Sequence, residues 1–187
     1  MKYLLKNTNN GFFYRDKFWL VLPGKKDEMS SGDIEKISQI KFDKIEINKK
    51  YKFHFNEREK LLGVGWSHNS GDYGIWSEGN ISFILFNLKN TNSETLKIKL
   101  NFQPYRSNKN KNFEMNIFFN SLLKESINLK NFKEKENLVF KIKKNELNKE
   151  NILMFKFNNL ISPLEIYESP DARKLGILLN SMKIIGD

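Results

Sequence analysis

Apolar and polar side chains alternate along most of the chain after residue 44. In residues 96–102 every second residue is apolar and those between are Lys or Asn, the pattern of a strand with one buried face. Residues 81–88 are apolar almost throughout, which is typical of a central strand covered on both faces. The expected strands span residues 45–47, 51–55, 81–88, 96–102, 113–119, 138–142, 153–157 and 175–184. Polar turns separate them, so the pattern predicts an all-β fold, a jelly-roll-like β-sandwich of about eight strands.

Residues 1–43 do not follow this pattern. Aromatic clusters at residues 12–14 and 18–22 end at the turn signal Pro23-Gly24, and residues 30–37 place capping residues before an apolar pair spaced by three. We therefore expect an N-terminal extension or lead-in over residues 1–43, with one small helix or, alternatively, an extra pair of edge strands. Residues 44–187 then form the β-sandwich domain.

The composition narrows the classes of function. The chain contains no cysteine, which excludes disulfides and thiolate metal sites. No apolar run approaches the ~20 residues of a membrane span, and the N-terminus lacks the apolar segment of a signal peptide, so we expect a cytoplasmic protein. The net charge of +10 comes almost entirely from lysine, since only four residues are arginine. Lysine lacks the bidentate contacts of arginine, and here it alternates with apolar residues. We interpret the lysines as solvated strand faces and expect no nucleic-acid partner.

One loop concentrates glycine and tryptophan. Residues 63–79 hold five of the ten glycines, two of the three tryptophans and one of the two histidines. Glycine permits sharp turns, and tryptophan offers a large flat apolar face. Such a loop suits a sugar, whose C–H face packs on an aromatic ring while polar side chains bind its hydroxyls. The alternative is that the tryptophans plug one end of the sandwich.

A second connection, residues 158–174, is long for a sandwich loop, and long loops in compact domains are often functional. We expect the loops 63–79 and 162–173 to meet at one end of the sandwich and to hold a glycan there. For Asp171 and Arg173, the structural alternative is an ion pair that staples the loop. The candidate sugar-binding residues are Trp66, His68, Asp72, Tyr73, Trp76, Glu78, Asp171 and Arg173.

The sequence favours a non-catalytic role. His68 lies near Ser67 and Asp72 in the chain, but no nucleophile elbow surrounds the serine. No phosphate-binding or dinucleotide fingerprint is present. We therefore expect no cofactor and no metal, although Asp72, Glu78 and Asp171 leave an oxygen cage for calcium open.

Two motifs that follow one another in the chain carry a family resemblance. The first is Gly-Trp-Ser at residues 65–67 with Gly-x-Trp-Ser-x-Gly at 74–79; the second is Ser-Pro-x-Glu at 162–165 with Ser-x-Asp-x-Arg-x-Leu-Gly at 169–176. Together they resemble a β-sandwich module of bacterial cell-surface polysaccharide assembly, found appended to glycosyltransferases and to membrane-bound phosphoglycerol-transferase-like proteins. The resemblance covers roughly residues 44–185. In the family a Pro-Glu pair often follows the first Trp-Ser, whereas Asn69-Ser70 stands here.

The resemblance implies a non-catalytic, carbohydrate-binding or accessory module in capsule or lipopolysaccharide biosynthesis. The alternative is a protein–protein docking or oligomerisation module of a glycosyltransferase with no ligand of its own, because tryptophan-rich loops also form protein hot spots. The expected partners are a glycan and a glycosyltransferase catalytic domain, with self-association as a further option and no span of the membrane. The expected location is cytoplasmic, or at the inner face of the membrane through these partners.

Overall fold

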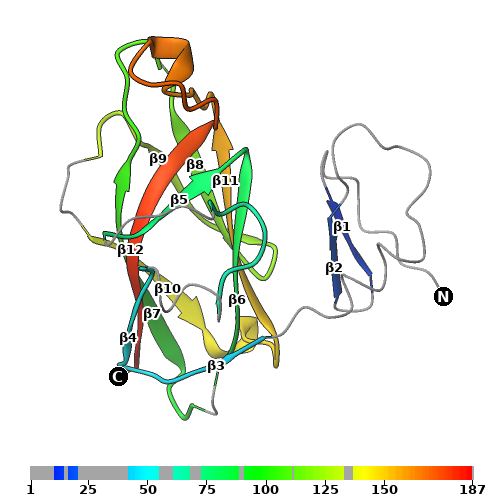
Figure 1. Cartoon of the computed structure of the whole chain (residues 1–187). Coiled ribbons are helices and arrows are strands. Elements are labelled where there is room, and N and C mark those ends of the chain that lie inside the picture. The colour runs from blue at the N-terminus through cyan, green and yellow to red at the C-terminus, as the bar shows by residue number, and fades with distance from the viewer. Residues whose placement is uncertain are drawn as a thin grey trace. The chain divides into compact units, whose positions relative to one another are not determined.

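The computed structural model describes residues 42–54, 61–67, 73–88, 91–110, 112–132 and 137–186, together with the backbone of residues 11–14 and 17–20. The chain divides into two compact units, residues 1–41 and residues 42–187 (Figure 1). In the first unit, β1 (Gly11–Tyr14) pairs antiparallel with β2 (Lys17–Leu20). The helix expected within residues 30–37 lies outside the described residues.

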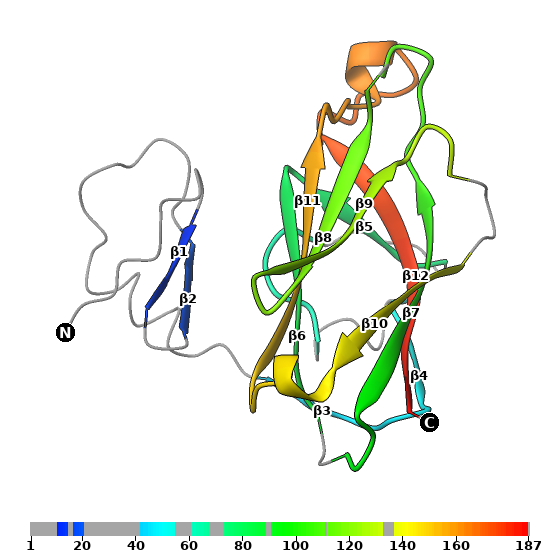
Figure 2. The same cartoon turned by 180° about the vertical axis from the view of Figure 1, so that it is seen from behind.

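The second unit is a sandwich of two five-stranded sheets, which confirms the predicted all-β fold (Figures 1 and 2). In the first sheet β10 pairs with β7, and β7 with the long strand β12. The other edge of β12 is bordered by two short strands, β5 along its first half and β4 along its second. The strands of this sheet are β4 (Lys50–Lys52), β5 (Ile75–Glu78), β7 (Thr95–Pro104), β10 (Asn137–Lys143) and β12 (Leu175–Gly186).

The second sheet has the order β3–β6–β11–β8–β9. Residues 61–64 also run along β6, through backbone hydrogen bonds to Phe83 and Leu85. Residues 82–86 are all buried, so β6 is covered on both faces, as the sequence predicts. The strands of this sheet are β3 (Lys44–Ile45), β6 (Ile81–Leu88), β8 (Glu114–Phe119), β9 (Leu122–Asn128) and β11 (Asn151–Asn158).

The alternation of residues misses two of these strands, β5 and β9. β5 has only four residues and lies within the glycine-rich segment, which reads as a loop. β9 is an edge strand with a largely exposed, polar sequence, so it carries no apolar stripe. The turn before it is typical of a hairpin, since Asn120 and Ser121 both have positive φ angles, 46° and 73°, as a two-residue turn requires.

The core lies between the two sheets. Inward side chains of both form one hydrophobic cluster, and the four apolar residues of 96–102 are fully buried within it. Two short 3₁₀ turns, η2 (Lys144–Glu146) and η3 (Leu164–Ile166), lie at opposite ends of the sandwich (Figure 1). The sandwich thus supplies a rigid frame, and the segment that contains η3 leads directly into β12.

Candidate functional site

The glycine-rich segment and the late connection are neighbours in space. β5 pairs with the first half of β12, and the backbone N–H of Gly79 donates to the carbonyl oxygen of Lys174 at 2.9 Å. Residues 65–67 lie along the other edge of β5, where Ser67 N donates to Trp76 O at 2.9 Å and Glu78 N to Gly65 O at 2.7 Å. The sequence predicts that these two segments meet, and they do.

The small residues of the two motifs make this close approach possible. Gly65 has a φ of +89°, and a Cβ added there would lie 2.0 Å from the backbone oxygen of Ile81. The buried hydroxyl of Ser77 accepts a hydrogen bond from the backbone N–H of Ile177 at 2.8 Å. A Cβ on Gly176 would lie 2.5 Å from that same hydroxyl oxygen. These motif residues therefore join β5 to its neighbours.

The two tryptophans of the first motif have different surroundings. Trp66 is 7% exposed, donates its Nε1–H to the backbone oxygen of Phe83 at 2.7 Å, and packs edge-on against Phe155. Trp66 is therefore a core residue with a satisfied indole N–H. Trp76 is half-buried, and its side chain shares the outward face of β5 with Glu78.

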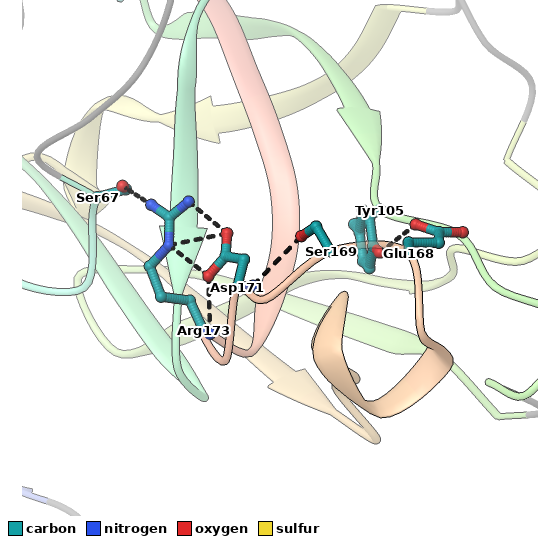
Figure 3. A network of polar contacts seen from close by, with 6 residues as sticks. All are labelled: Ser67, Tyr105, Glu168, Ser169, Asp171 and Arg173. Carbon is teal, nitrogen blue, oxygen red and sulfur yellow. Dashed lines mark hydrogen bonds and ion pairs between the residues drawn. The ribbon is translucent and has the colours of Figure 1, made fainter.

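Aromatic rings and carboxylates gather around Trp76 on the outer face of the first sheet. Trp76 lies opposite Leu178 of β12, and Leu178 lies opposite Gln103 of β7. Tyr105, just beyond β7, meets Trp76 in an edge-to-face arrangement with ring centroids 5.7 Å apart. The Tyr105 hydroxyl donates to a Glu168 carboxylate oxygen at 2.6 Å (Figure 3).

An ion pair is connected to Trp76 through Ser67, whose backbone N–H donates to the Trp76 carbonyl oxygen. The Asp171 carboxylate accepts from Arg173 Nε at 2.9 Å and from Nη2 at 2.5 Å, and from the Arg173 backbone N–H at 2.9 Å. The remaining guanidinium nitrogen donates to the Ser67 hydroxyl, so the pair also connects the two segments (Figure 3). The Asp171 side chain is 23% exposed and the Arg173 side chain is 31% exposed. We call the set Trp76, Glu78, Tyr105, Glu168, Asp171 and Arg173 the Trp76–Arg173 surface.

The electrostatics of this surface favour the charged forms of Asp171 and Arg173 and the neutral phenol of Tyr105. Hydrogen bonds from Arg173 hold the pKa of Asp171 below its ordinary value, although burial opposes this effect. The same hydrogen bonds raise the pKa of Arg173, and the nearby Glu78 charge adds to the shift. Burial raises the pKa of the Tyr105 phenol, and the hydrogen bond to Glu168 raises it further. The surface therefore presents the neutral phenol of Tyr105 together with the charged Asp171–Arg173 pair.

The loop that ends at Asp171 is fixed by its own contacts. Ser162 and Glu165 exchange hydrogen bonds in the manner of a capping box: the Ser162 N–H donates to Glu165 Oε2 at 2.7 Å, and the Glu165 N–H to Ser162 Oγ at 3.2 Å. Tyr167, which follows η3, adopts a left-handed conformation with φ of 62° and is 90% exposed. The Lys109 ammonium lies 4.9 Å from its ring centroid. This loop thus displays an aromatic side chain at its tip.

The structure brings together four of the eight predicted site residues: Trp76, Glu78, Asp171 and Arg173. Trp66 belongs to the core, and it offers no open ring face to a ligand. Tyr73 is 82% exposed but lies before β5, at the end of that strand away from Glu78. The remaining two predicted residues, His68 and Asp72, lie outside the described residues. The predicted staple between Asp171 and Arg173 is present as an ion pair.

Four residues of the network in Figure 3 were not among the predicted ones: Ser67, Tyr105, Glu168 and Ser169, whose hydroxyl accepts from the Asp171 N–H at 3.3 Å. The signal for Ser67 is its place in the Gly-Trp-Ser motif, whose serine is buried and bonded to Arg173. Tyr105 and Glu168 are 63 residues apart in the chain. Tyr105 follows β7 and Glu168 lies in the loop before β12, so the pairing of these two strands places the residues near each other, and no local pattern carries that information.

Among the residues that the structure describes, no group of three or more His, Cys, Asp or Glu side chains is arranged to hold a metal ion. The calcium cage left open by the sequence includes Asp72, which lies outside this set. The described part of the chain also has no helix with the length and apolar character needed to cross a membrane.

No protein-family model matches the sequence, and no curated protein matches it. Among solved structures, the mosquito-larvicidal Cry4Aa toxin from Bacillus thuringiensis is 12% identical over 78% of this chain and 25% of the toxin chain, with a TM-score of 0.45. A family 35 carbohydrate-binding module from an environmental isolate is 10% identical over 74% of this chain and 85% of the module, with a TM-score of 0.35. The CBM51-2 and INT domains of ZmpB from Clostridium perfringens are 11% identical over 75% of this chain and 29% of that one, with a TM-score of 0.35. The chain thus spans about a quarter of the length of the toxin. Because β-sandwich domains serve many unrelated functions, such likenesses leave the function to be decided by the site.

Proposed function

We propose that residues 42–186 form a non-catalytic carbohydrate-binding module whose glycan site is the Trp76–Arg173 surface. One observation carries this proposal: Ser67 connects the Trp76–Tyr105 aromatic pair, on the outer face of one sheet, to the partly exposed Asp171–Arg173 ion pair. Its backbone N–H donates to the Trp76 carbonyl oxygen, and its hydroxyl accepts from Arg173. A pyranose has an apolar C–H face and a rim of hydroxyls. An aromatic side chain packs on the first, and charged groups form strong hydrogen bonds with the second.

The surface is held in place before any ligand arrives. Trp76 and Glu78 project from a strand, and Arg173 is fixed by Asp171 on one side and by Ser67 on the other. A site on rigid elements loses little side-chain freedom on binding, so less of the interaction free energy is offset by lost entropy. The Tyr105 hydroxyl is fixed in the same way by Glu168.

We further propose that the glycan belongs to bacterial surface polysaccharide assembly and that the module is accessory to a glycosyltransferase. This part of the proposal rests on the order and spacing of the two motifs, residues 65–79 and 162–176. Several motif residues hold the two segments together, so the motif pattern describes the frame of the site. A pull-down from bacterial membranes with the chain as bait, repeated with the Trp76→Ala variant, tests for a glycosyltransferase partner.

An array of purified bacterial capsular polysaccharides and lipopolysaccharide O-chains tests glycan binding directly. We expect binding to a subset of the array, lost on Trp76→Ala and on Arg173→Gln. Tyr167→Ala is the matched control, because it removes an exposed aromatic side chain outside this surface. Absence of binding to every polysaccharide, or equal binding by the wild type and Trp76→Ala, would refute the glycan site.

The exposed loop tip favours docking to a protein as a second candidate function. Tyr167 and Leu164 are 90% and 48% exposed on the same short turn. Aromatic side chains displayed in this way are common anchors at protein interfaces. Light scattering at rising concentration, and the same pull-down with Tyr167→Ala, separate this role from glycan binding, because Tyr167 lies outside the Trp76–Arg173 surface.

A further inference from the structure

Lysines gather on the outer face of the first sheet, along the second half of β12. Lys183 of β12 lies directly opposite Lys99 of β7 on one side and Lys50 of β4 on the other. Two residues before Lys99 on β7, Lys97 lies directly opposite Lys141 of β10. Their neighbours in sequence are the inward, buried residues of these strands, so the lysines point outward. We call the set Lys50, Lys52, Lys97, Lys99, Lys141 and Lys183 the lysine face.

Negative charge is missing from these strands. β4, β7, β10 and β12 contain no Asp or Glu at any position. Within the described residues, Lys50, Lys99, Lys141 and Lys183 form no ion pair with a carboxylate. The second sheet differs, since Glu114 of β8 and Glu125 of β9 accompany its lysines. The concentration of lysine is therefore a property of one face.

This arrangement costs stability in the free protein. Like charges directly opposite one another on neighbouring strands repel, and here three lysines follow one another across three strands. An anionic partner would turn that repulsion into attraction. Because neighbouring strands lie ~4.8 Å apart, such a partner meets a closely spaced row of ammonium groups.

The residues between the lysines indicate the class of partner. Among the other outward positions, Asn101 and Asn137 carry amide groups and are hydrogen-bonded to each other at 3.3 Å, while Val139 and Ile185 are apolar. Amide groups bind sugar hydroxyls. The outward positions of the four strand segments that form the lysine face carry no aromatic side chain for stacking on nucleobases and no arginine for bidentate contacts to phosphate. Val139, which is 46% exposed, and Ile185 lie on β10 and β12 with the lysines of β7 between them, so they form no apolar cluster for insertion into a lipid surface.

We propose that the lysine face binds a linear acidic polysaccharide, one that carries an anionic group at regular intervals along the chain. The face is distinct from the Trp76–Arg173 surface and does not depend on it. Leu178, which lies opposite Trp76, and Lys183 are five residues apart on β12, about 17 Å at ~3.3 Å per residue. The two surfaces are therefore far enough apart to be changed separately.

The experiment compares two triple variants that lose the same charge. Lys50→Gln/Lys99→Gln/Lys183→Gln changes the lysine face, and Lys130→Gln/Lys149→Gln/Lys156→Gln changes lysines elsewhere on the second unit. The probe is polygalacturonate, with dextran as the neutral polymer, and binding is measured by isothermal titration between 25 and 200 mM salt, about the range in which such contacts weaken steeply.

We expect polygalacturonate to bind and dextran not to bind. The face variant should bind polygalacturonate about tenfold more weakly or worse, with the salt slope reduced by about 2, while the control variant changes affinity less than about threefold. Removal of opposing like charges should leave the melting temperature of the face variant unchanged or higher, so unfolding cannot explain a loss of binding. Trp76→Ala should keep its affinity for polygalacturonate, which separates this proposal from the glycan site.

Three results would overturn the proposal. The first is no polygalacturonate binding at 25 mM salt. The second is an equal loss of affinity in both triple variants, which would indicate a general effect of net charge. The third is tighter binding of duplex DNA or of phosphatidylglycerol vesicles that depends on Lys99 and Lys183, which would assign the face to nucleic acid or to membrane instead.

Discussion

Trp66 and Trp76 are ten residues apart in one motif, but Trp66 is a core residue and Trp76 lies on the outer face of a sheet. The same substitution at both positions, Trp66→Phe and Trp76→Phe, separates stability from binding. Trp66→Phe removes the hydrogen bond from Nε1 to the Phe83 carbonyl and leaves part of a buried indole site empty. Trp76→Phe changes a half-buried side chain on the outer face of β5.

The magnitudes follow from these surroundings. Loss of the buried hydrogen bond costs about 1 kcal/mol. Shrinkage of the indole to a benzene ring costs about 1–2 kcal/mol more, a fraction of the 3–5 kcal/mol for complete removal of a buried aromatic side chain. Trp66→Phe should therefore lower the unfolding free energy by about 2–3 kcal/mol, and the melting temperature by about 4–12 °C for a domain of this size. Trp76→Phe should cost less than about 1 kcal/mol, as is usual at partly exposed positions.

Urea denaturation followed by far-ultraviolet circular dichroism measures both stabilities without use of tryptophan fluorescence. Binding to the strongest ligand from the polysaccharide array, measured on folded protein at 15 °C, should change less than about twofold for Trp66→Phe. Trp76→Phe should weaken that binding about two- to twelvefold, because the smaller ring keeps an aromatic contact but loses part of its face, a loss of about 0.5–1.5 kcal/mol. Equal stabilities of the two variants, or a binding loss confined to Trp66→Phe, would refute the assignment of core and surface roles.

Three further predictions concern the junction of the two segments. Gly65→Ala should cost more than about 2 kcal/mol of stability by thermal denaturation, because the new Cβ meets a backbone oxygen at the start of β6. Gly79→Ala should cost only the backbone strain, because Gly79 has a φ of 77° and a Cβ there has no atom within 4 Å. Equal costs of the two substitutions would contradict this reasoning. Ser77→Ala should cost about 1–3 kcal/mol in urea denaturation, because the buried N–H of Ile177 loses its acceptor, and a cost near zero would mean that another acceptor replaces the serine. The lowered pKa of Asp171 means that its carboxylate stabilises the fold above its ordinary unfolded pKa of about 3.9 and loses this effect as the pH falls through the folded pKa. Wild type should therefore exceed Asp171→Asn in stability by up to about 1 kcal/mol at pH 7, with the gap closing below about pH 4 in denaturation at stepped pH; a gap that widens in acid would reverse the sign.

Much of the fold was predictable because a buried strand face leaves a period of two in the sequence. β7 is the clearest example, with each of its alternate apolar residues fully buried. The order of strands was not predictable, since it depends on pairing between distant segments. β5 was missed because four residues are too few to establish a period, and its pairing with β12 decides where the strand lies.

In the candidate site, too, local motifs were predictive, whereas features that depend on the pairing of distant strands were not. The motif residues indicated that residues 63–79 and 162–173 belong together, and the contact between Ser67 and Arg173, 106 residues apart, bears this out. Nothing in the sequence distinguishes Trp66 as the inward and Trp76 as the outward tryptophan, because a shift of one residue in a strand exchanges its two faces. The alternation of lysine with apolar residues predicts solvated strand faces, and these lysines do point outward. The register of β4, β7, β10 and β12 places these lysines side by side on one face of one sheet. The sequence of a single strand does not contain this information.

The central claim is that a glycan binds on the outer face of β5, beside the ion pair. Heteronuclear NMR of the three indole N–H groups during titration with the strongest polysaccharide from the array tests it most directly. The account predicts a dose-dependent shift of the Trp76 indole signal, with the Trp66 signal unchanged because its N–H is buried and bonded to Phe83. Saturable binding that leaves the Trp76 signal in place would contradict the account.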